Sequence, residues 1–175
     1  MHSIYTGVTQ SGKTTLARRH SRLLHDKGHQ VFVYDPVMSL THGGDWGCDF
    51  ITDDFDILHD FMLDHHARKG GAAHVYIDEA GELFSVGQKE NHWLMTRGRH
   101  MGFQINLIAQ RPTMMAPTAR TQCGRGYMFR MAPDDMEIMG KDFGHGQLGN
   151  TPMEHGDYLV LTSGFPAIEK FNCFN

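Results

Sequence analysis

Residues 7–14 read GVTQSGKT, a glycine-rich octapeptide that ends in a lysine and a threonine. This pattern, G-x-x-x-x-G-K-[ST], lets backbone amides surround the phosphates of a nucleotide at the start of a helix. Gly7 and Gly12 permit backbone angles that a Cβ would penalise. Lys13 is expected to reach the β- and γ-phosphates, and the Thr14 hydroxyl to bind Mg²⁺. The motif therefore predicts ATP as the ligand. The expected binding residues are Gly7, Val8, Thr9, Gln10, Ser11, Gly12, Lys13, Thr14 and Thr15.

Two adjacent acids, Asp78 and Glu79, follow the largely apolar segment 74–77. Asp78 would hold the Mg²⁺ shell through water, and Glu79 would polarise the attacking water as the catalytic base. A kinase transfers phosphate to a bound hydroxyl and has less use for a water-activating carboxylate at this position. The pair therefore favours hydrolysis.

The segment 91–132 contains no aspartate or glutamate, although the chain has 20 acidic residues. Its guanidinium groups could act as arginine fingers on a γ-phosphate, or neutralise a DNA backbone without reading its sequence. A solvated basic face is the alternative interpretation. The arginines of this segment are Arg97, Arg99, Arg111, Arg120, Arg125 and Arg130.

Gln110 closes an expected strand over residues 103–109 within the same segment. It could lie between the strands that carry Gly7 and Asp78, and sense the γ-phosphate through the attacking water. A turn-facing amide would explain Gln110 equally well.

An alternation of strands and helices is expected to position these residues, which is typical of a parallel sheet covered on both faces. Asp53 or Asp54 could cap the second helix. Right-handed crossovers then predict a three-layer α/β P-loop NTPase of the ASCE/RecA-like type, with a central, mainly parallel sheet and a C-terminal antiparallel hairpin. The expected strands are 2–6, 30–34, 73–78, 103–109 and 126–131, the helices 13–27, 53–68, 89–97 and 133–140, and the hairpin strands 157–163 and 167–171.

Length and composition narrow the class of protein. The 175 residues predict one P-loop ATPase domain over 1–175. Three isolated cysteines suit a reducing cytoplasm, and the phosphate-loop motif begins too early to leave room for a signal peptide. No apolar run approaches 18 residues, so we expect no membrane insertion. The formal net charge of −4 means that nucleic-acid binding would depend on a local patch.

Three segments together resemble the FtsK–HerA superfamily of DNA-pumping P-loop ATPases. They are GVTQSGKTT at 7–15, VYIDEAGELF at 75–84 and TRGRHMGFQINLIAQRPT at 96–113, and the resemblance covers about residues 3–131. It implies a homo-oligomeric ring, usually a hexamer, that translocates double-stranded DNA through a central pore by ATP hydrolysis.

The resemblance also implies that nucleotide lies between subunits and that an arginine of the neighbour completes the site. Arg97 or Arg99 fits this trans role by position, and Gln110 fits the sensor. Segments 38–50 and 111–122 are the candidates for DNA contacts in the pore.

Because the chain is a bare motor core, it is most similar to the small genome-packaging ATPases of icosahedral viruses with an internal membrane. This implies a motor in the host cytoplasm that fills a preformed capsid, with proteins of the packaging vertex as partners. A nucleoside or nucleotide kinase, with Asp35 as its base, is one alternative. Others are a zonula-occludens-toxin-like filamentous-phage assembly ATPase, and a non-hydrolytic assembly factor in which Glu79 is structural.

Overall fold

A computed structural model describes residues 1–37, 46–146 and 148–174. Its centre is an eight-stranded sheet in the order β3-β2-β4-β5-β1-β6-β7-β8. The six strands from β3 to β6 in this order are parallel, while β7 and β8 extend the sheet antiparallel. The mainly parallel sheet and the C-terminal antiparallel hairpin predicted from the sequence are therefore confirmed. The strands are β1 (His2–Thr6), β2 (Gln30–Tyr34), β3 (Phe50–Thr52), β4 (Ala73–Ile77), β5 (Phe103–Ala109), β6 (Cys123–Phe129), β7 (Asp157–Thr162) and β8 (Glu169–Asn172).

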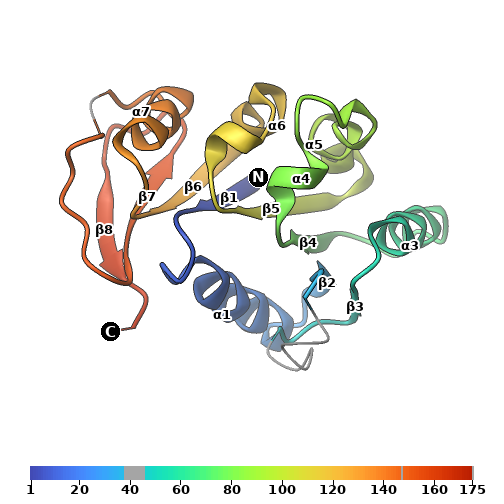
Figure 1. Cartoon of the computed structure of the whole chain (residues 1–175). Helices are drawn as coiled ribbons and strands as arrows, with labels where there is room; N and C mark the ends of the chain where they lie inside the picture. Colours follow the sequence, from blue (N-terminus) through green and yellow to red (C-terminus); the bar gives the residue numbers. More distant parts are fainter. Residues whose placement is uncertain (38–45, 147, 175) are drawn as a thin grey trace.

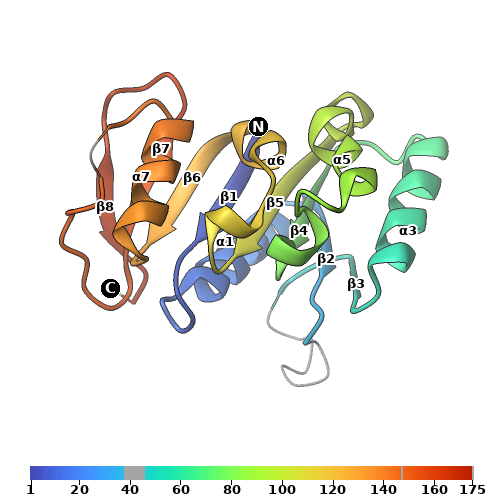
Figure 2. The same ribbon diagram turned by 45° about the horizontal axis from the view of Figure 1, so that its top comes forward.

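Helices cover the two faces of the sheet unequally. Figure 1 shows α1 on one face and the remaining helices above the other face. Figure 2 shows the latter in a row from α3 at one end to α7 near the antiparallel strands. The helices are α1 (Lys13–Asp26), α3 (Phe55–Ala67), α4 (Ala80–Leu83), α5 (Trp93–Thr96), α6 (Pro117–Thr121) and α7 (Pro133–Asp142). Short 3₁₀ turns lie at Lys89–Asn91, Gly98–Met101 and Pro112–Met114.

Alternation along the strands divides the core between the two faces. On β1, Ile4 belongs to the larger cluster under α3–α7, whereas its neighbour Tyr5 belongs to the cluster beside α1. Leu16 of α1 and Trp46 also belong to the smaller cluster, and these four side chains are almost fully buried. Packing on both faces therefore fixes β1 in the middle of the sheet. The phosphate loop follows the carboxyl end of this strand.

Several predicted elements have the expected bounds. Strands 2–6, 30–34 and 103–109 are confirmed, and Asp54 caps α3 by accepting hydrogen bonds from the amides of Asp56 and Ile57 at 2.9 and 3.3 Å. The predicted strand 126–131 instead runs over Cys123–Phe129. These differences leave the order of the elements unchanged.

The predicted helix 89–97 is wrong as a continuous helix. A 3₁₀ turn and the single turn α5 replace it. The Asn91 side chain donates to the carbonyl of Leu83 at 2.8 Å, and the His92 ring lies 3.2 Å from the carbonyl of Ser85. These side-chain bonds to a preceding loop compete with a regular helical ladder. Three further elements, β3, α4 and α6, were not predicted from the sequence, because each is too short to show a hydrophobic period.

Candidate functional site

The phosphate loop lies between β1 and α1, at the carboxyl end of β1. Gly12 has φ 107°, a left-handed conformation that favours glycine, immediately before α1 begins at Lys13. The amide of Val8 donates to the carbonyl of Arg130 at 3.0 Å, and the amide of Ser11 donates to the carbonyl of Val8 at 3.2 Å. The loop is thus a folded turn anchored to the end of β6.

The loop has the chemistry to receive an anion. The Lys13 side chain is buried and forms no ion pair with a carboxylate in the described part of the chain. A buried ammonium group without a partner is costly, and a phosphate group would compensate it. Within the same residues, the Ser11 hydroxyl is buried and has no hydrogen-bond partner. The cradle therefore fits the phosphates of a nucleotide.

The structure brings the two predicted Mg²⁺ ligands together across 64 positions of sequence. The Thr14 hydroxyl donates to a carboxylate oxygen of Asp78 at 3.4 Å. Burial raises the pKa of the Asp78 carboxyl to about 6, and the neighbouring Glu79 adds to the effect. A hydroxyl and a carboxylate are hard oxygen ligands that suit Mg²⁺, whose charge would stabilise the ionised carboxylate. The pair fits a magnesium ion with a partial water shell.

Glu79 follows in an unusual backbone conformation, with φ 49°. Its amide donates to the Asp78 carboxylate at 2.9 Å, which ties the two acids together. The side-chain amide of Gln110 donates to the Glu79 carboxylate at 3.4 Å, and the Thr9 hydroxyl donates to Gln110 at 3.4 Å. Because β5 lies between β4 and β1 as predicted, Gln110 connects the acid pair to the phosphate loop.

Arg97 and Arg99 lie away from the phosphate loop of their own chain. Both precede β5 and are exposed, and Arg99 lines a hollow beside Met1 and His2 at the start of β1. The loop lies at the opposite end of β1. The structure therefore does not bring these two arginines to the nucleotide site within one chain.

Two of the six arginines in the acid-free segment, Arg111 and Arg120, form ion pairs with carboxylates from outside the segment. Arg111 pairs with the buried Asp135 at 2.9 Å. Arg120 is itself buried, pairs with Asp142 at 2.7 Å, and donates to two backbone carbonyls. These acids come from α7, after the segment ends, so the sequence pattern did not reveal them. Arg120 lies in the predicted pore segment 111–122, and its contacts stabilise the packing of that segment against α7.

The other predicted pore segment, 38–50, falls largely outside the described residues, since 38–45 are not among them. Its described part includes Trp46, which is buried and donates to the Asp35 carboxylate at 2.9 Å. Arg18 also pairs with Asp35 at 3.1 Å. Asp35, the base considered for a kinase, is fully buried in these contacts and is not open to a substrate hydroxyl.

The sequence did not predict the C-terminal residues that reach the phosphate loop. The His155 ring donates from Nε2 to the carbonyl of Gln10 at 3.1 Å and stacks on Phe174 with ring centroids 5.0 Å apart. A Cβ added to Gly12 would lie 2.5 Å from the sulfur of Cys173. No local motif marks these residues, because only the sheet order brings β7 and β8 beside the loop.

Among the described residues, no group of three or more histidine, cysteine, aspartate or glutamate side chains could hold a metal ion. None of the helices in that part of the chain has the length and apolar character needed to cross a bilayer.

Comparison with known proteins identifies relatives by structure only. No protein-family model matches the chain, and no curated protein sequence matches it. The genome-packaging NTPase B204 of Sulfolobus turreted icosahedral virus 2, in complex with AMPPCP, superimposes with a TM-score of 0.80 at 17% identity. The match covers 98% of this chain and 96% of B204.

Two further structures match 98% of this chain at 17% identity. One is the pCW3 conjugation coupling protein TcpA, with a TM-score of 0.76 and 59% of that chain covered. The other is the cytoplasmic domain of the Type VII secretion ATPase EccC of Thermomonospora curvata, with a TM-score of 0.68 and 25% covered. Identity this low establishes the fold alone. The resemblance seen in the sequence is thus confirmed at the level of structure: the chain has the α/β fold of these P-loop ATPases over nearly its whole length.

Proposed function

We propose that this chain is an ATPase that couples ATP hydrolysis to the translocation of double-stranded DNA, as the genome-packaging motor of a virus. The observation that carries the proposal is the convergence of Thr14, Asp78, Glu79 and Gln110 at the phosphate loop. These groups come from three separated segments of the chain. A site that bound a nucleotide without hydrolysing it would not need Glu79 and Gln110.

Each residue has a distinct part in the proposed reaction. Lys13 and the loop amides bind the β- and γ-phosphates, while Thr14 and Asp78 hold Mg²⁺. The metal ion supplies charge neutralisation of the phosphates when bound. Glu79 accepts a proton from the attacking water, and the Gln110 amide holds the Glu79 carboxylate in position through its hydrogen bond.

Two C-terminal residues, His155 and Phe174, lie beside the phosphate loop. Phe174 is half exposed, with 54% of its surface accessible, and its ring lies next to Gly12. An aromatic ring in this position can stack on a nucleotide base. We therefore assign Phe174, supported by His155, to base binding.

Arg97 and Arg99 support an oligomeric arrangement. Because they lie before the amino end of β5, and the phosphate loop follows the carboxyl end of the neighbouring β1, we expect either to reach a nucleotide only on another subunit. A head-to-tail ring, with a hexamer as the expected size, would place this end of the sheet against the neighbour's loop. An arginine supplied in trans would then stabilise charge in the transition state. Capsid vertex proteins are the proposed partners of the ring.

The decisive experiment measures the ATPase rate with and without long double-stranded DNA, together with the oligomeric mass. We expect DNA to stimulate hydrolysis, and the stimulation to weaken as salt rises, because phosphate contacts release counterions. Bound ATP without turnover under all conditions would instead favour the non-hydrolytic assembly factor. Phosphate transfer to a nucleoside would favour the kinase, against which the buried Asp35 already argues.

A further inference from the structure

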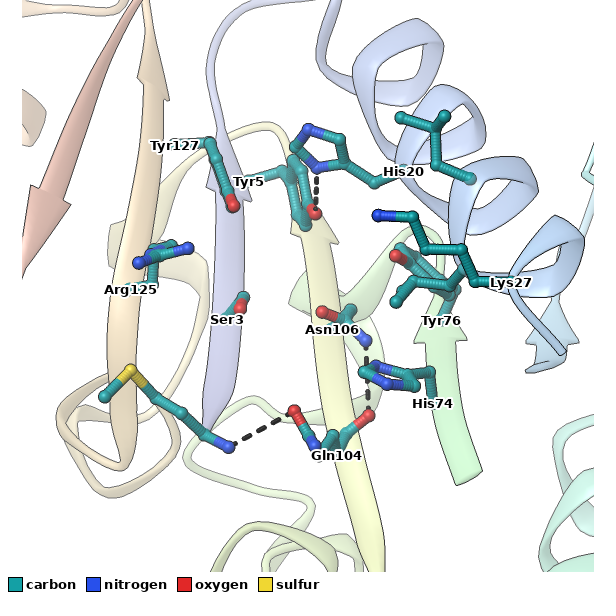
Figure 3. A pocket seen from close by; sticks show the side chains of 13 residues that line it. Ser3, Tyr5, His20, Lys27, His74, Tyr76, Gln104, Asn106, Arg125 and Tyr127 are labelled. Atoms are coloured by element: carbon teal, nitrogen blue, oxygen red, sulfur yellow. Dashed lines mark hydrogen bonds between the residues drawn. The ribbon is translucent and has the colours of Figure 1, made fainter. Parts of the chain in front are cut away.

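A second cavity lies on the face of the sheet that α1 covers only in part. It has a volume of about 380 Å³ and is bounded by α1 and by strands β1, β4, β5 and β6 (Figure 3). Ser3 and Arg125 lie in the amino-terminal halves of β1 and β6, whereas the phosphate loop follows the carboxyl end of β1. The cavity is therefore separate from the proposed ATP site.

The charges around this cavity have one sign. Among the described residues, no aspartate or glutamate lines it, although acids outnumber lysine and arginine in the chain by 20 to 16. Lys27 at the end of α1 and Arg125 on β6 contribute two cations from different walls. Neither forms an ion pair within the described residues, in contrast to Arg111 and Arg120. The cavity thus presents uncompensated positive charge.

The floor of the cavity is polar but uncharged. The Tyr5 hydroxyl is hydrogen-bonded to Nδ1 of His20 at 2.9 Å, a contact seen in Figure 3. Burial lowers the pKa of His20 to about 4 and raises the pKa of the Tyr5 and Tyr76 hydroxyls. At neutral pH these groups therefore neither cancel nor add to the charge of Lys27 and Arg125.

Hydrogen-bond donors remain free beside the two cations. Tyr127 stacks on Tyr5, with ring centroids 4.5 Å apart and planes 15° apart. Within the described part of the chain, no hydrogen bond occupies the hydroxyl of Tyr127 or that of Ser3. In Figure 3 both hydroxyls and the Lys27 amine point into the space between α1 and the strands. Two cations and two hydroxyls therefore line the same cavity, and groups of these kinds bind the oxygens of a phosphate group.

We propose that this cavity binds a phosphate-bearing anion, with Arg125 and Lys27 supplying charge and Ser3 and Tyr127 donating hydrogen bonds. The phosphate could belong to a small phosphate compound or to a nucleic-acid backbone, since both present the same oxygens. The site goes beyond the proposed ATPase and does not depend on hydrolysis.

Amide chemical shifts in ¹⁵N-labelled protein test this assignment. The titrations use two samples in which the phosphate loop cannot bind the probe. One is Lys13→Ala protein, and the other is wild-type protein whose loop is saturated by a non-hydrolysable ATP analogue. Inorganic phosphate, pyrophosphate and a short DNA duplex are titrated separately. Arg125→Gln and Lys27→Gln are compared with Arg68→Gln, which removes an exposed positive charge at the C-terminal cap of α3, a residue that does not line the cavity.

We expect at least one probe to shift resonances of Ser3, Tyr127 and Arg125 in a saturable manner. Arg125→Gln and Lys27→Gln should each weaken the affinity about tenfold or more, as expected for a lost charged hydrogen bond, while Arg68→Gln leaves it unchanged. Saturable shifts with phosphate or pyrophosphate would identify the ligand as a small phosphate compound. Saturable shifts with the duplex alone would identify it as a nucleic-acid backbone. Absence of saturable shifts with all three probes, or equal weakening by Arg68→Gln, overturns the proposal.

Discussion

The side-chain amide of Gln110 donates to the carboxylate of Glu79 over 3.4 Å, joining the end of β5 to the acid pair that follows β4. The Thr9 hydroxyl donates to the same Gln110 from the phosphate loop. A change at the loop on nucleotide binding can therefore reach the proposed catalytic base through one intervening side chain.

Replacing the proposed base should separate binding from hydrolysis. Glu79→Gln keeps the shape of the side chain but cannot accept the proton, so we expect unchanged ATP affinity and a rate lower by about 10²- to 10⁴-fold. Steady-state ATPase rates and equilibrium nucleotide binding measure the two quantities. Glu82→Gln, on the neighbouring turn of α4, is the matched control and should retain activity. Brisk hydrolysis by Glu79→Gln would remove Glu79 from the mechanism.

Gln110→Ala should lower kcat about tenfold with little change in KM, because it removes a group that positions Glu79 and leaves the loop intact. Gln88→Ala, an exposed glutamine in another loop, serves as the control. A raised KM with an unchanged kcat would show that Gln110 contributes to ground-state binding instead.

Lys13→Ala should abolish detectable ATP binding, since it removes the buried cation of the loop.

If Arg97 or Arg99 acts in trans, Arg97→Ala and Arg99→Ala proteins should also lose activity on their own. Mixing either inactive arginine variant with Lys13→Ala protein should restore part of the rate, because some interfaces then combine an intact loop with an intact arginine. A mixture that stays inactive at every ratio would contradict catalysis between subunits.

Phe174→Ala should raise KM for ATP about tenfold, as expected for the loss of one aromatic–base stack. Phe174→Tyr keeps the ring and should retain most of the affinity. Phe165→Ala is the control, because this phenylalanine is similarly exposed but lies in the turn between β7 and β8. Equal KM values for the Phe165→Ala and Phe174→Ala proteins would rule out base stacking by Phe174.

His2 should make the protein sensitive to acid. Its Nδ1 accepts the Ile105 amide at 2.9 Å, and burial lowers its pKa from 6.5 to about 4. Because the unfolded state then binds a proton at higher pH than the folded state, stability is lost as pH falls from about 6.5 to 4. His2→Gln should reduce the loss of unfolding free energy over this pH range by roughly 3 kcal/mol, measured by urea unfolding at several pH values. An unchanged slope would mean that His2 titrates normally.

The sequence predicted those parts of the site that depend on local spacing. The loop at Gly7–Thr14, the acid pair and Gln110 each sit beside a strand end, and a parallel sheet brings such ends together. The pairing of Arg111 with Asp135 and of Arg120 with Asp142 was not predictable, because each joins segments more than 20 positions apart without a shared period. The same limit hid the approach of His155 and Phe174 to the loop.

The hydrogen bond between His155 and Gln10 closes a loop of 145 residues. Contacts of such separation form late in folding, because the chain loses much entropy before they stabilise it. The phosphate loop can therefore adopt its final surroundings only after β6, β7 and β8 have joined the sheet. Nucleotide affinity during refolding should consequently report completion of the whole sheet rather than formation of β1 and α1.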